Sequence, residues 1–246
     1  MTDKFRILIF SDIHANAISL NAIFSELDTR RFDEILFLGD AALFGPQPKE
    51  VLEFLRKINC VSIMGNAESW LLNGQKFEAN KKDAREIFEI NQWCANQLSE
   101  DGLSFFRKYQ QPFETKIGDY SILFCHGSPT SNKEAILSST GDVDMDRFTS
   151  KTQANIIVSG HTHVQMLRKY KTTTFINPGS VGCPTVRTQG KSAYFPYAEY
   201  AIITIENSEL GVEFFRTHID TKSIYQAAQK NKMPHYDWWF KRWMLS

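Results

Sequence analysis

Side chains that can bind a metal ion follow directly after five apolar stretches of the sequence. The first stretch, "FRILIF" (5–10), leads into Asp12 and His14. The other four stretches end on the following residues: Asp40; Asn66; His126; and His161 with His163. Loops at strand ends are common places for functional sites, because a rigid sheet holds them. One such ending arises easily by chance, but five are difficult to explain by turns and helix caps.

Each of these residues also has an ordinary structural explanation. Asp40 is a typical turn residue, Asn66 a typical helix cap, and His126 could be a buried histidine with satisfied hydrogen bonds. The ordinary explanation is weaker for His161 and His163, because side chains two residues apart in an extended segment can flank one ion. The joint pattern therefore favours a metal site.

Together these side chains offer carboxylate, imidazole and amide donors without a thiolate. Such a set suits Mn²⁺, Fe, Zn²⁺, Co²⁺ or Ni²⁺ better than Ca²⁺ or an iron–sulfur cluster. It is too large for one tetrahedral ion and fits two ions, about 3.5–4 Å apart, that hold a bridging hydroxide and clamp phosphoryl oxygens. We expect Asp40 to bridge the ions, because no imidazole lies beside it in the sequence. The predicted chemistry is phosphoryl transfer to water.

Alternating strand-like and helix-like stretches must position these side chains. Strands are expected at 5–10, 33–40, 60–66, 119–127 and 155–163, and helices at 16–27, 48–58, over most of 69–106 and at 221–231. Further strands are expected at 172–180, 197–207 and 211–219. Strand–helix alternation followed by hairpins predicts an α/β fold with two stacked sheets flanked by helices. No repeat or linker interrupts the pattern, so we expect one domain over residues 1–246.

The composition narrows the class of function. Lysine plus arginine and aspartate plus glutamate both number 28, so a nucleic acid is not expected as the partner. No apolar window of about 18 residues or more predicts a membrane span, and the apolar N-terminal run is too short for a signal peptide. The four cysteines lack CxxC spacing, which predicts reduced, mostly buried thiols and a cytoplasmic location.

The ordered series "SDIH", "GD", "GN", "HG" and "GHTH" resembles the motifs of the calcineurin-like metallophosphoesterases. The match is closest to their small bacterial and archaeal phosphodiesterase branch, and it extends from about Phe5 to Val186. Two further segments, "GDAALFGPQPKEVLEFL" and "INPGSVGCP", also resemble that branch. The resemblance implies a four-layer αββα sandwich of two mixed β-sheets, with the metals at the carboxyl ends of the strands.

The resemblance also implies two divalent transition-metal ions, of which Mn²⁺ is expected first. Carried over by motif, the ligands are as follows: Asp12, His14 and His163 for one ion; Asn66, His126 and His161 for the other; and Asp40 for both. Asn66 and His126 would also stabilise charge on the reacting phosphate.

The third motif departs from the family pattern. The family usually has GNH followed by Asp or Glu, and this histidine is thought to protonate the leaving group; the chain has "GNAES", with Ala67 at that position. General acid catalysis typically contributes about 10²–10⁴-fold. Glu68 could replace the acid, or it could form a supporting hydrogen bond or place a charge at a helix start. We therefore expect cleavage of substrates with stable leaving groups, such as nucleotide anhydrides or activated diesters, and slow cleavage of alkyl monoesters.

Three residues are candidates for substrate binding: Asn16, Phe44 and Ser180. Asn16 equally suits a helix N-cap, and the turns "FGP" and "NPGSVG" that contain the other two could simply be turns. Trp70 could line the pocket or lie in the core. The C-terminal "HYDWWFKRWMLS" could pack on the domain, form a dimer contact or anchor at a membrane surface. His218 and His235 fit no motif.

The leading interpretation is a metal-dependent phosphohydrolase that acts on a small phosphorylated substrate, with a homodimer left open. The alternative is a non-catalytic scaffold of the same fold that binds a partner protein, as the family's retromer subunit does. Ala67 supports the alternative, and the complete ligand set opposes it. A nucleic-acid substrate is a weaker third interpretation, because about 6–10 phosphate contacts would need a basic groove.

Overall fold

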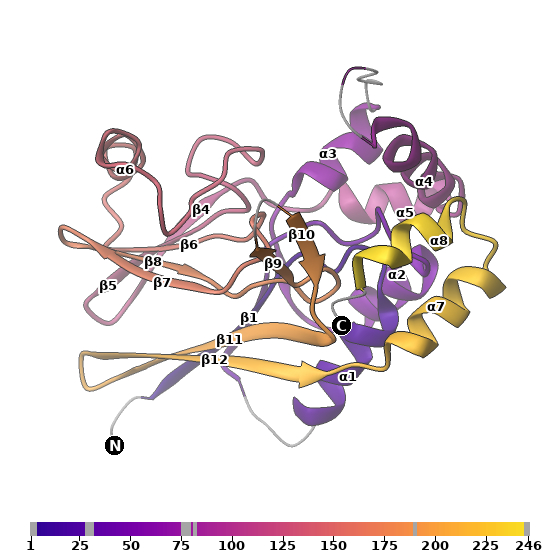
Figure 1. Cartoon of the computed structure of the whole chain (residues 1–246). Helices are drawn as coiled ribbons and strands as arrows, with labels where there is room; N and C mark the ends of the chain where they lie inside the picture. Colours follow the sequence, from indigo (N-terminus) through magenta and orange to yellow (C-terminus); the bar gives the residue numbers. More distant parts are fainter. Residues whose placement is uncertain (1–3, 28–31, 75–79, 81–82, 189–190, 244–246) are drawn as a thin grey trace.

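Two mixed β-sheets stack face to face, and helices cover their outer faces (Figure 1). The structure is a computed structural model and describes residues 4–27, 32–74, 80, 83–188 and 191–243. This is the predicted α/β arrangement of four layers.

The first sheet has the strand order β12-β11-β1-β2-β3. Its strands are β1 (Phe5–Phe10), β2 (Glu34–Phe37), β3 (Val61–Ser62), β11 (Tyr197–Glu206) and β12 (Glu209–His218). β1, β2 and β3 run parallel, whereas β11 pairs antiparallel with both β1 and β12. β1 therefore lies at the centre, between an early strand and a late one.

The second sheet has the order β4-β5-β6-β8-β7. Its strands are β4 (Phe113–Ile117), β5 (Tyr120–Phe124), β6 (Ile156–Val158), β7 (Met166–Tyr170) and β8 (Thr173–Asn177). The three central strands are parallel, and β4 and β7 close the edges in antiparallel pairing. A separate hairpin consists of β9 (Thr185–Thr188) and β10 (Lys191–Tyr194).

The helices lie outside the two sheets. They are α1 (Ala17–Leu27), α2 (Pro48–Lys57), α3 (Asn66–Asn73), α4 (Ala84–Asn96), α5 (Glu100–Phe106), α6 (Asp142–Thr149), α7 (Thr221–Lys230), α8 (Tyr236–Phe240) and the 3₁₀ turn η1 (Lys241–Trp243). α6 packs on the second sheet, away from the other helices (Figure 1). None of the described helices is long and apolar enough to cross a membrane.

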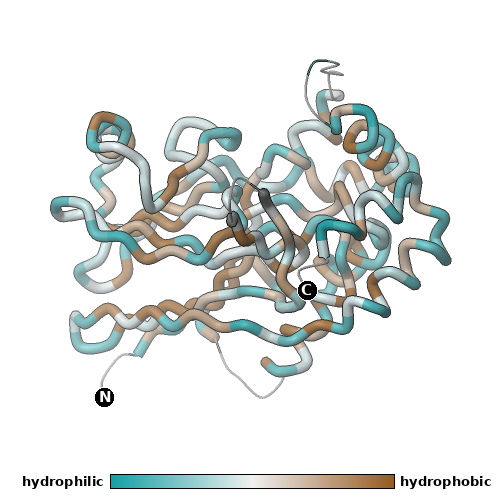
Figure 2. Tube along the Cα trace, in the orientation of Figure 1, coloured by the Kyte–Doolittle hydropathy of each residue, from teal (hydrophilic) through white to brown (hydrophobic). Residues whose placement is uncertain are grey.

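Alternation along β1 explains the layering. Leu8 and Phe10 point into the core shared with the helices, whereas Ile7 and Ile9 point into the core between the sheets. Both faces of the strand are buried from Ile7 to Phe10, so these four residues form a continuous apolar run. Figure 2 shows the same apolar character along the inner strands.

Some elements differ from the sequence prediction. The third strand is short: only Val61 and Ser62 pair with β2, and Ile63, whose N–H still donates to the Phe37 carbonyl, forms an isolated bridge with Gln110. β4, β7, β9, β10 and α6 were not predicted. The edge strands β4 and β7 have few buried residues, so they lack the apolar run of a central strand. The predicted helical region 69–106 contains most of α3 and all of α4 and α5, and residues 75–79 and 81–82 within it lie outside the described residues.

Candidate metal centre

Loops from both sheets meet at the carboxyl ends of their parallel strands. The predicted ligands come from these places: Asp12 and His14 after β1, Asp40 after β2, Asn66 at the start of α3, His126 after β5, and His161 and His163 after β6. Residues that are far apart in the sequence thus reach one region, as expected for strand-end loops.

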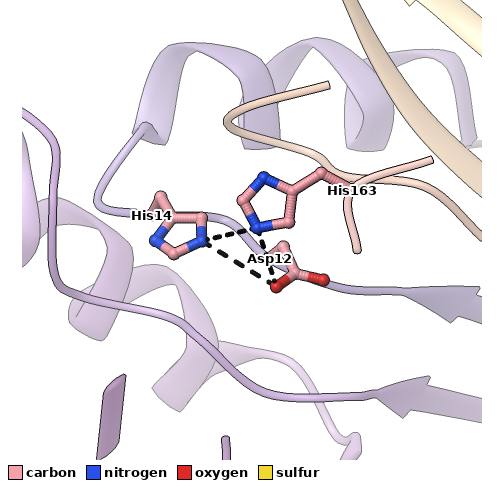
Figure 3. A group of neighbouring side chains, drawn as sticks. All are labelled: Asp12, His14 and His163. Atoms are coloured by element: carbon pink, nitrogen blue, oxygen red, sulfur yellow. Dashed lines mark hydrogen bonds and ion pairs between the residues drawn. The ribbon is translucent and has the colours of Figure 1, made fainter. Parts of the chain in front are cut away.

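Two overlapping groups of acidic and histidine side chains could each hold a metal ion. One group is Asp12, His14 and His163, and the other is Asp12, Asp40 and His126. Within each group the potential ligand atoms all lie within 4.8 Å of one another. Figure 3 shows the first group, in which both imidazoles face the Asp12 carboxylate.

In the first group two imidazole nitrogens face each other. His14 Nε2 lies 3.0 Å from His163 Nε2, and His163 Nε2 lies 3.2 Å from Asp12 Oδ1. The other ring nitrogens, Nδ1, face the backbone carbonyls of Leu43 at 3.1 Å and Cys183 at 3.0 Å. A carbonyl oxygen only accepts, so each Nδ1 donates and each neutral ring presents a lone pair at Nε2.

In the second group Asp40 reaches toward both sides of the site. Its Oδ1 lies 3.5 Å from His126 Nε2, and its Oδ2 lies 3.7 Å from His14 Nε2. His126 Nε2 is also 3.2 Å from Asn66 Oδ1, and the His126 ring centroid is 5.2 Å from that of His161. His126 Nδ1 faces the carbonyl of Leu38 at 2.7 Å, so its Nε2 also points into the site.

The side chains present fit a bound cation. Two imidazole lone pairs 3.0 Å apart repel each other unless a positive charge lies between or beside them. Asp12 Oδ1 is buried and has no hydrogen-bond partner among the described residues, because the neighbouring Nε2 of a neutral His163, at 3.2 Å, presents a lone pair and no N–H. A buried carboxylate oxygen without a partner is costly, and a metal ion supplies the missing contact.

Two buried carboxylates set the charge of the site. Burial alone would raise the pKa of Asp12, but His163, His126 and His14 outweigh burial and hold this pKa below its usual range. Burial and His163 together lower the pKa of His14 to about 4. Burial opposes a charged His126, yet Asp40 and Asp12 raise its pKa to about 10. The carboxylates thus attract positive charge, which divalent ions can supply in place of protons.

The backbone at these ligands is strained. Several of them have a left-handed backbone: Asp12 (φ 56°), His14 (φ 47°), Asp40 (φ 64°), His161 (φ 66°) and His163 (φ 60°). Residues other than glycine seldom adopt this conformation, and such strain concentrates at functional sites. The surrounding fold therefore holds the ligand side chains in place against local preference.

The family model described as "Calcineurin-like phosphoesterase superfamily domain" matches residues 5–208. The chain belongs to this superfamily. The matched residues include all the predicted ligands, so the convergence described above occurs within the superfamily domain.

Several proteins are similar to this chain over nearly its whole length. A protein of Methanocaldococcus jannaschii is 26% identical over 95% of this chain and 96% of its own. The crystal structure of a metallophosphoesterase from Sphaerobacter thermophilus is 25% identical, covers 97% of each chain and superposes with a TM-score of 0.71. A protein from Pyrococcus horikoshii is 18% identical over 96% of each chain, with a TM-score of 0.77. These likenesses agree with the predicted metallophosphoesterase fold.

Glu68, in the superfamily's third motif, lies behind the ligands. Its fully buried carboxylate accepts hydrogen bonds from the backbone N–H groups of Asp40 at 2.9 Å, Ala41 at 2.6 Å and Gly65 at 3.0 Å. Burial and the nearby Asp40 raise its pKa to about 7. These contacts match the supporting role considered for Glu68, because they join the loop after β2 to the start of α3.

Asn16 and Ser180, proposed for substrate binding, are fully buried and engaged elsewhere. Asn16 Oδ1 accepts from the N–H of Ser19, which caps α1, and its Nδ2 donates to the carbonyl of Gly182. Ser180 Oγ donates to the carbonyl of Asp12 at 2.7 Å and accepts from the N–H of Cys183. Both residues thus support the ligand loops, and the sequence alone did not distinguish this role from substrate contact.

Phe44, the third candidate, lies at the edge of the site. Its ring meets the His14 ring edge-on, with 6.3 Å between the centroids. The C-terminal segment α8–η1 packs on the same loop, because Trp239 Nε1 donates to the Phe44 carbonyl at 2.8 Å. Packing on the domain is one of the roles considered for this segment, although residues 244–246 lie outside the described residues.

The remaining predicted features lie outside the two groups. Trp70 is partly buried against the core, His218 ends β12, and His235 contacts Glu89 at 2.6 Å. A cavity of about 490 Å³ backs onto the loop after β6, and Thr162 forms part of its wall. The cavity is therefore next to the metal centre but is not formed by the predicted ligands.

Proposed function

We propose that the protein is a metal-dependent phosphohydrolase that uses two divalent ions, with Mn²⁺ expected first. The substrate is a small phosphodiester or nucleotide phosphoanhydride. The observation that carries this proposal is the position of Asp40, whose Oδ1 lies 3.5 Å from His126 Nε2 in one predicted ligand set and whose Oδ2 lies 3.7 Å from His14 Nε2 in the other. This position would let one carboxylate contribute to both ions, and membership of the phosphoesterase superfamily supports the reaction class.

The proposed ligands form two sets. They are Asp12, His14 and His163 for one ion; Asn66, His126 and His161 for the other; and Asp40 for both. Bound divalent ions would supply Lewis acidity toward phosphoryl oxygens and activate water as the nucleophile. The chain itself fixes the imidazole orientations through the carbonyls of Leu38, Leu43 and Cys183, so the donors need little rearrangement when a substrate binds.

Two of these ligands and one neighbouring residue affect the reaction further. The amide of Asn66 and the ring of His126 are expected to stabilise negative charge that develops on the phosphate. Ala67 lies where the family usually places the histidine that protonates the leaving group, and its backbone N–H donates to Asp40 Oδ1 at 2.8 Å. Its side chain offers no proton, so the leaving group must depart without help from this position.

An assay with matched esters tests this proposal. We expect turnover of bis-p-nitrophenyl phosphate with Mn²⁺ and much slower turnover of an alkyl phosphodiester, because general acid catalysis is worth about 10²–10⁴-fold for poor leaving groups. Asp40→Asn should abolish both activities. Equal rates on the two esters would contradict the missing-acid argument, and no turnover with any divalent metal would contradict the enzyme.

A non-catalytic scaffold is the second candidate, and Ala67 is the observation that favours it. A scaffold does not require strained, mutually repelling metal ligands, so the site geometry supports the enzyme more strongly. The two candidates differ in the Asp40→Asn variant, since a scaffold that needs no metal would keep its partner binding in that variant.

A further inference from the structure

We propose that Arg242 binds a second anionic group of the substrate, such as the distal phosphate of a nucleotide phosphoanhydride. This inference rests on the proposed phosphohydrolase function. It favours a phosphoanhydride over a simple diester, which carries no second charged phosphate. Arg242 belongs to η1, beyond residue 208, where the superfamily match ends.

Arg242 lies one aromatic ring away from a proposed metal ligand. Its guanidinium carbon is 5.7 Å from the centroid of the Phe44 ring, and that ring meets His14 edge-on. η1 contacts β10, near the C-terminal end of the chain in Figure 1. The Arg242 guanidinium therefore lies at the His14 side of the site, next to Phe44, which forms the edge of the site.

The backbone that carries Arg242 is firmly anchored. Trp239 is fully buried and donates to the Phe44 carbonyl, and Trp243 packs its ring against Tyr194 at 5.4 Å between centroids. The guanidinium itself stacks on the Trp238 ring, with 3.8 Å from its carbon to the ring centroid. A preorganised arginine loses little conformational freedom when it binds a phosphate.

Its hydrogen-bonding capacity is only partly used. Among the described residues, the guanidinium donates to the Trp238 carbonyl at 3.4 Å and lies 3.5 Å from Asp83 Oδ2. Both contacts are long, and the side chain is 22% exposed. A guanidinium has five N–H donors in one plane, and stacking occupies its face but not its edge. The N–H groups along this edge can therefore donate two hydrogen bonds to a phosphate, in the bidentate manner typical of arginine.

The chain offers a matched control in Arg56, at the end of α2. Arg56 also lies over an aromatic ring, Phe105, at 5.6 Å, and pairs with an aspartate, Asp101, at 2.7 Å. Arg242→Gln and Arg56→Gln thus each remove one positive charge that pairs with an aspartate and lies over a phenylalanine ring. They differ in that Arg242 also stacks on Trp238 and in the surroundings of the phenylalanine. Among the described residues the aromatic contacts of Phe105 are with Phe106 and Tyr109, whereas Phe44 contacts His14.

Kinetics with Mn²⁺ on ADP and bis-p-nitrophenyl phosphate separate recognition from folding. Hydrolysis of ADP adds water, breaks the P–O–P bond and yields AMP and phosphate. We expect Arg242→Gln to raise KM for ADP about tenfold more than KM for the diester, with little change in kcat for ADP, because a charge-assisted contact is lost. Arg242→Lys should have an intermediate effect, and Arg56→Gln should change neither KM. An equal loss on both substrates would overturn the proposal.

Calorimetry provides a readout that does not depend on turnover. Methylenediphosphonate should bind the Mn²⁺-loaded protein about tenfold more weakly after Arg242→Gln, whereas binding of inorganic phosphate should change much less. Unchanged diphosphonate binding would overturn the role of Arg242. If the unmodified protein binds diphosphonate through Arg242 but hydrolyses neither substrate, the hydrolase proposal fails while anion recognition stands.

Discussion

At the scale of single residues, the site consists of buried side chains whose positions are fixed by hydrogen bonds from neighbouring groups. Asp12, His14 and Asp40 occupy left-handed backbone and direct their polar atoms toward one another. Neither arrangement is favourable in isolation. Supporting groups such as Glu68 must therefore maintain the geometry before any ion binds.

Replacing Glu68 should weaken both the fold and the metal centre. Glu68→Gln keeps the shape of the side chain but turns an amide NH₂ toward backbone N–H groups that now donate to a carboxylate. We expect the free energy of unfolding to fall by about 1–3 kcal/mol. The affinity for Mn²⁺ should fall about 10–100-fold.

Urea unfolding and metal titration measure these two effects. Glu100→Gln is the control, because Glu100 forms an exposed pair with Arg107 and should contribute about 0–1 kcal/mol. Equal behaviour of the two variants would show that Glu68 does not hold the ligand loops.

The cysteines allow a second test at the residue scale. Burial raises the pKa of Cys94 to about 12 and that of Cys125 to about 12, and it raises the pKa of Cys183 as well. Cys60 is only partly buried. Since the thiolate is the reactive form, Ellman's reagent at pH 8 should label at most Cys60 in the native protein and every cysteine in urea. Rapid labelling of a second native thiol would contradict the burial described above.

At the scale of elements, the loops after β2 and before α3 cross at very short range. Gly39 has φ +100°, and a Cβ added there would lie 2.8 Å from the Cα of Gly65. The close approach brings Asp40 next to Asn66 and lets Glu68 reach both loops. A side chain at Gly39 would separate them.

Replacing Gly39 with alanine should therefore lower the free energy of unfolding more than the same replacement at a glycine that has free space around it. Gly118 has φ +57°, and its nearest neighbour would be Ile205 Cγ2 at 3.8 Å. Gly118→Ala should cost only the left-handed penalty, about 1–2 kcal/mol. Gly39→Ala should lower the free energy of unfolding by about 1–3 kcal/mol more, because the added Cβ would force the backbone at Gly65 to move. Urea unfolding of both variants measures the difference, and equal losses would contradict the close crossing.

The sequence predicted which acidic and histidine side chains come together better than it predicted the elements around them. The ends of the central strands could be recognised in the sequence, because these strands are apolar runs and acidic or histidine residues follow them. β4 and β7 were missed because edge strands alternate polar and apolar residues. The carbonyls that orient the histidines could not be predicted, since a backbone acceptor has no sequence signature. The tryptophans of the C-terminal segment suggested that it could pack on the domain, but they did not indicate which loop it would contact.

At the scale of the whole molecule, the predicted ligands come from both sheets and meet in one place, so metal binding should stabilise the entire fold. With Mn²⁺ about 100-fold above its Kd, the free energy of unfolding should rise by about 2.7 kcal/mol. Tm should rise by about 5–10 °C for a chain of this size. Calorimetry after EDTA treatment and Mn²⁺ addition measures this shift. An unchanged Tm, or the same shift in Asp40→Asn, would argue against the centre.

The central place of β1 affects how the protein forms during synthesis. The loop after β1 carries Asp12 and His14. β1 pairs with β2 on one side, but its other partner is β11, which comes far later in the chain: Phe5 lies opposite Ile205. Until the ribosome releases that region, the first sheet presents an unpaired apolar edge in its middle. Such edges attract other nascent chains. We therefore expect translation speed and chaperone supply to influence the yield of native protein. Substitutions near α6, which covers only the second sheet, should influence this yield less.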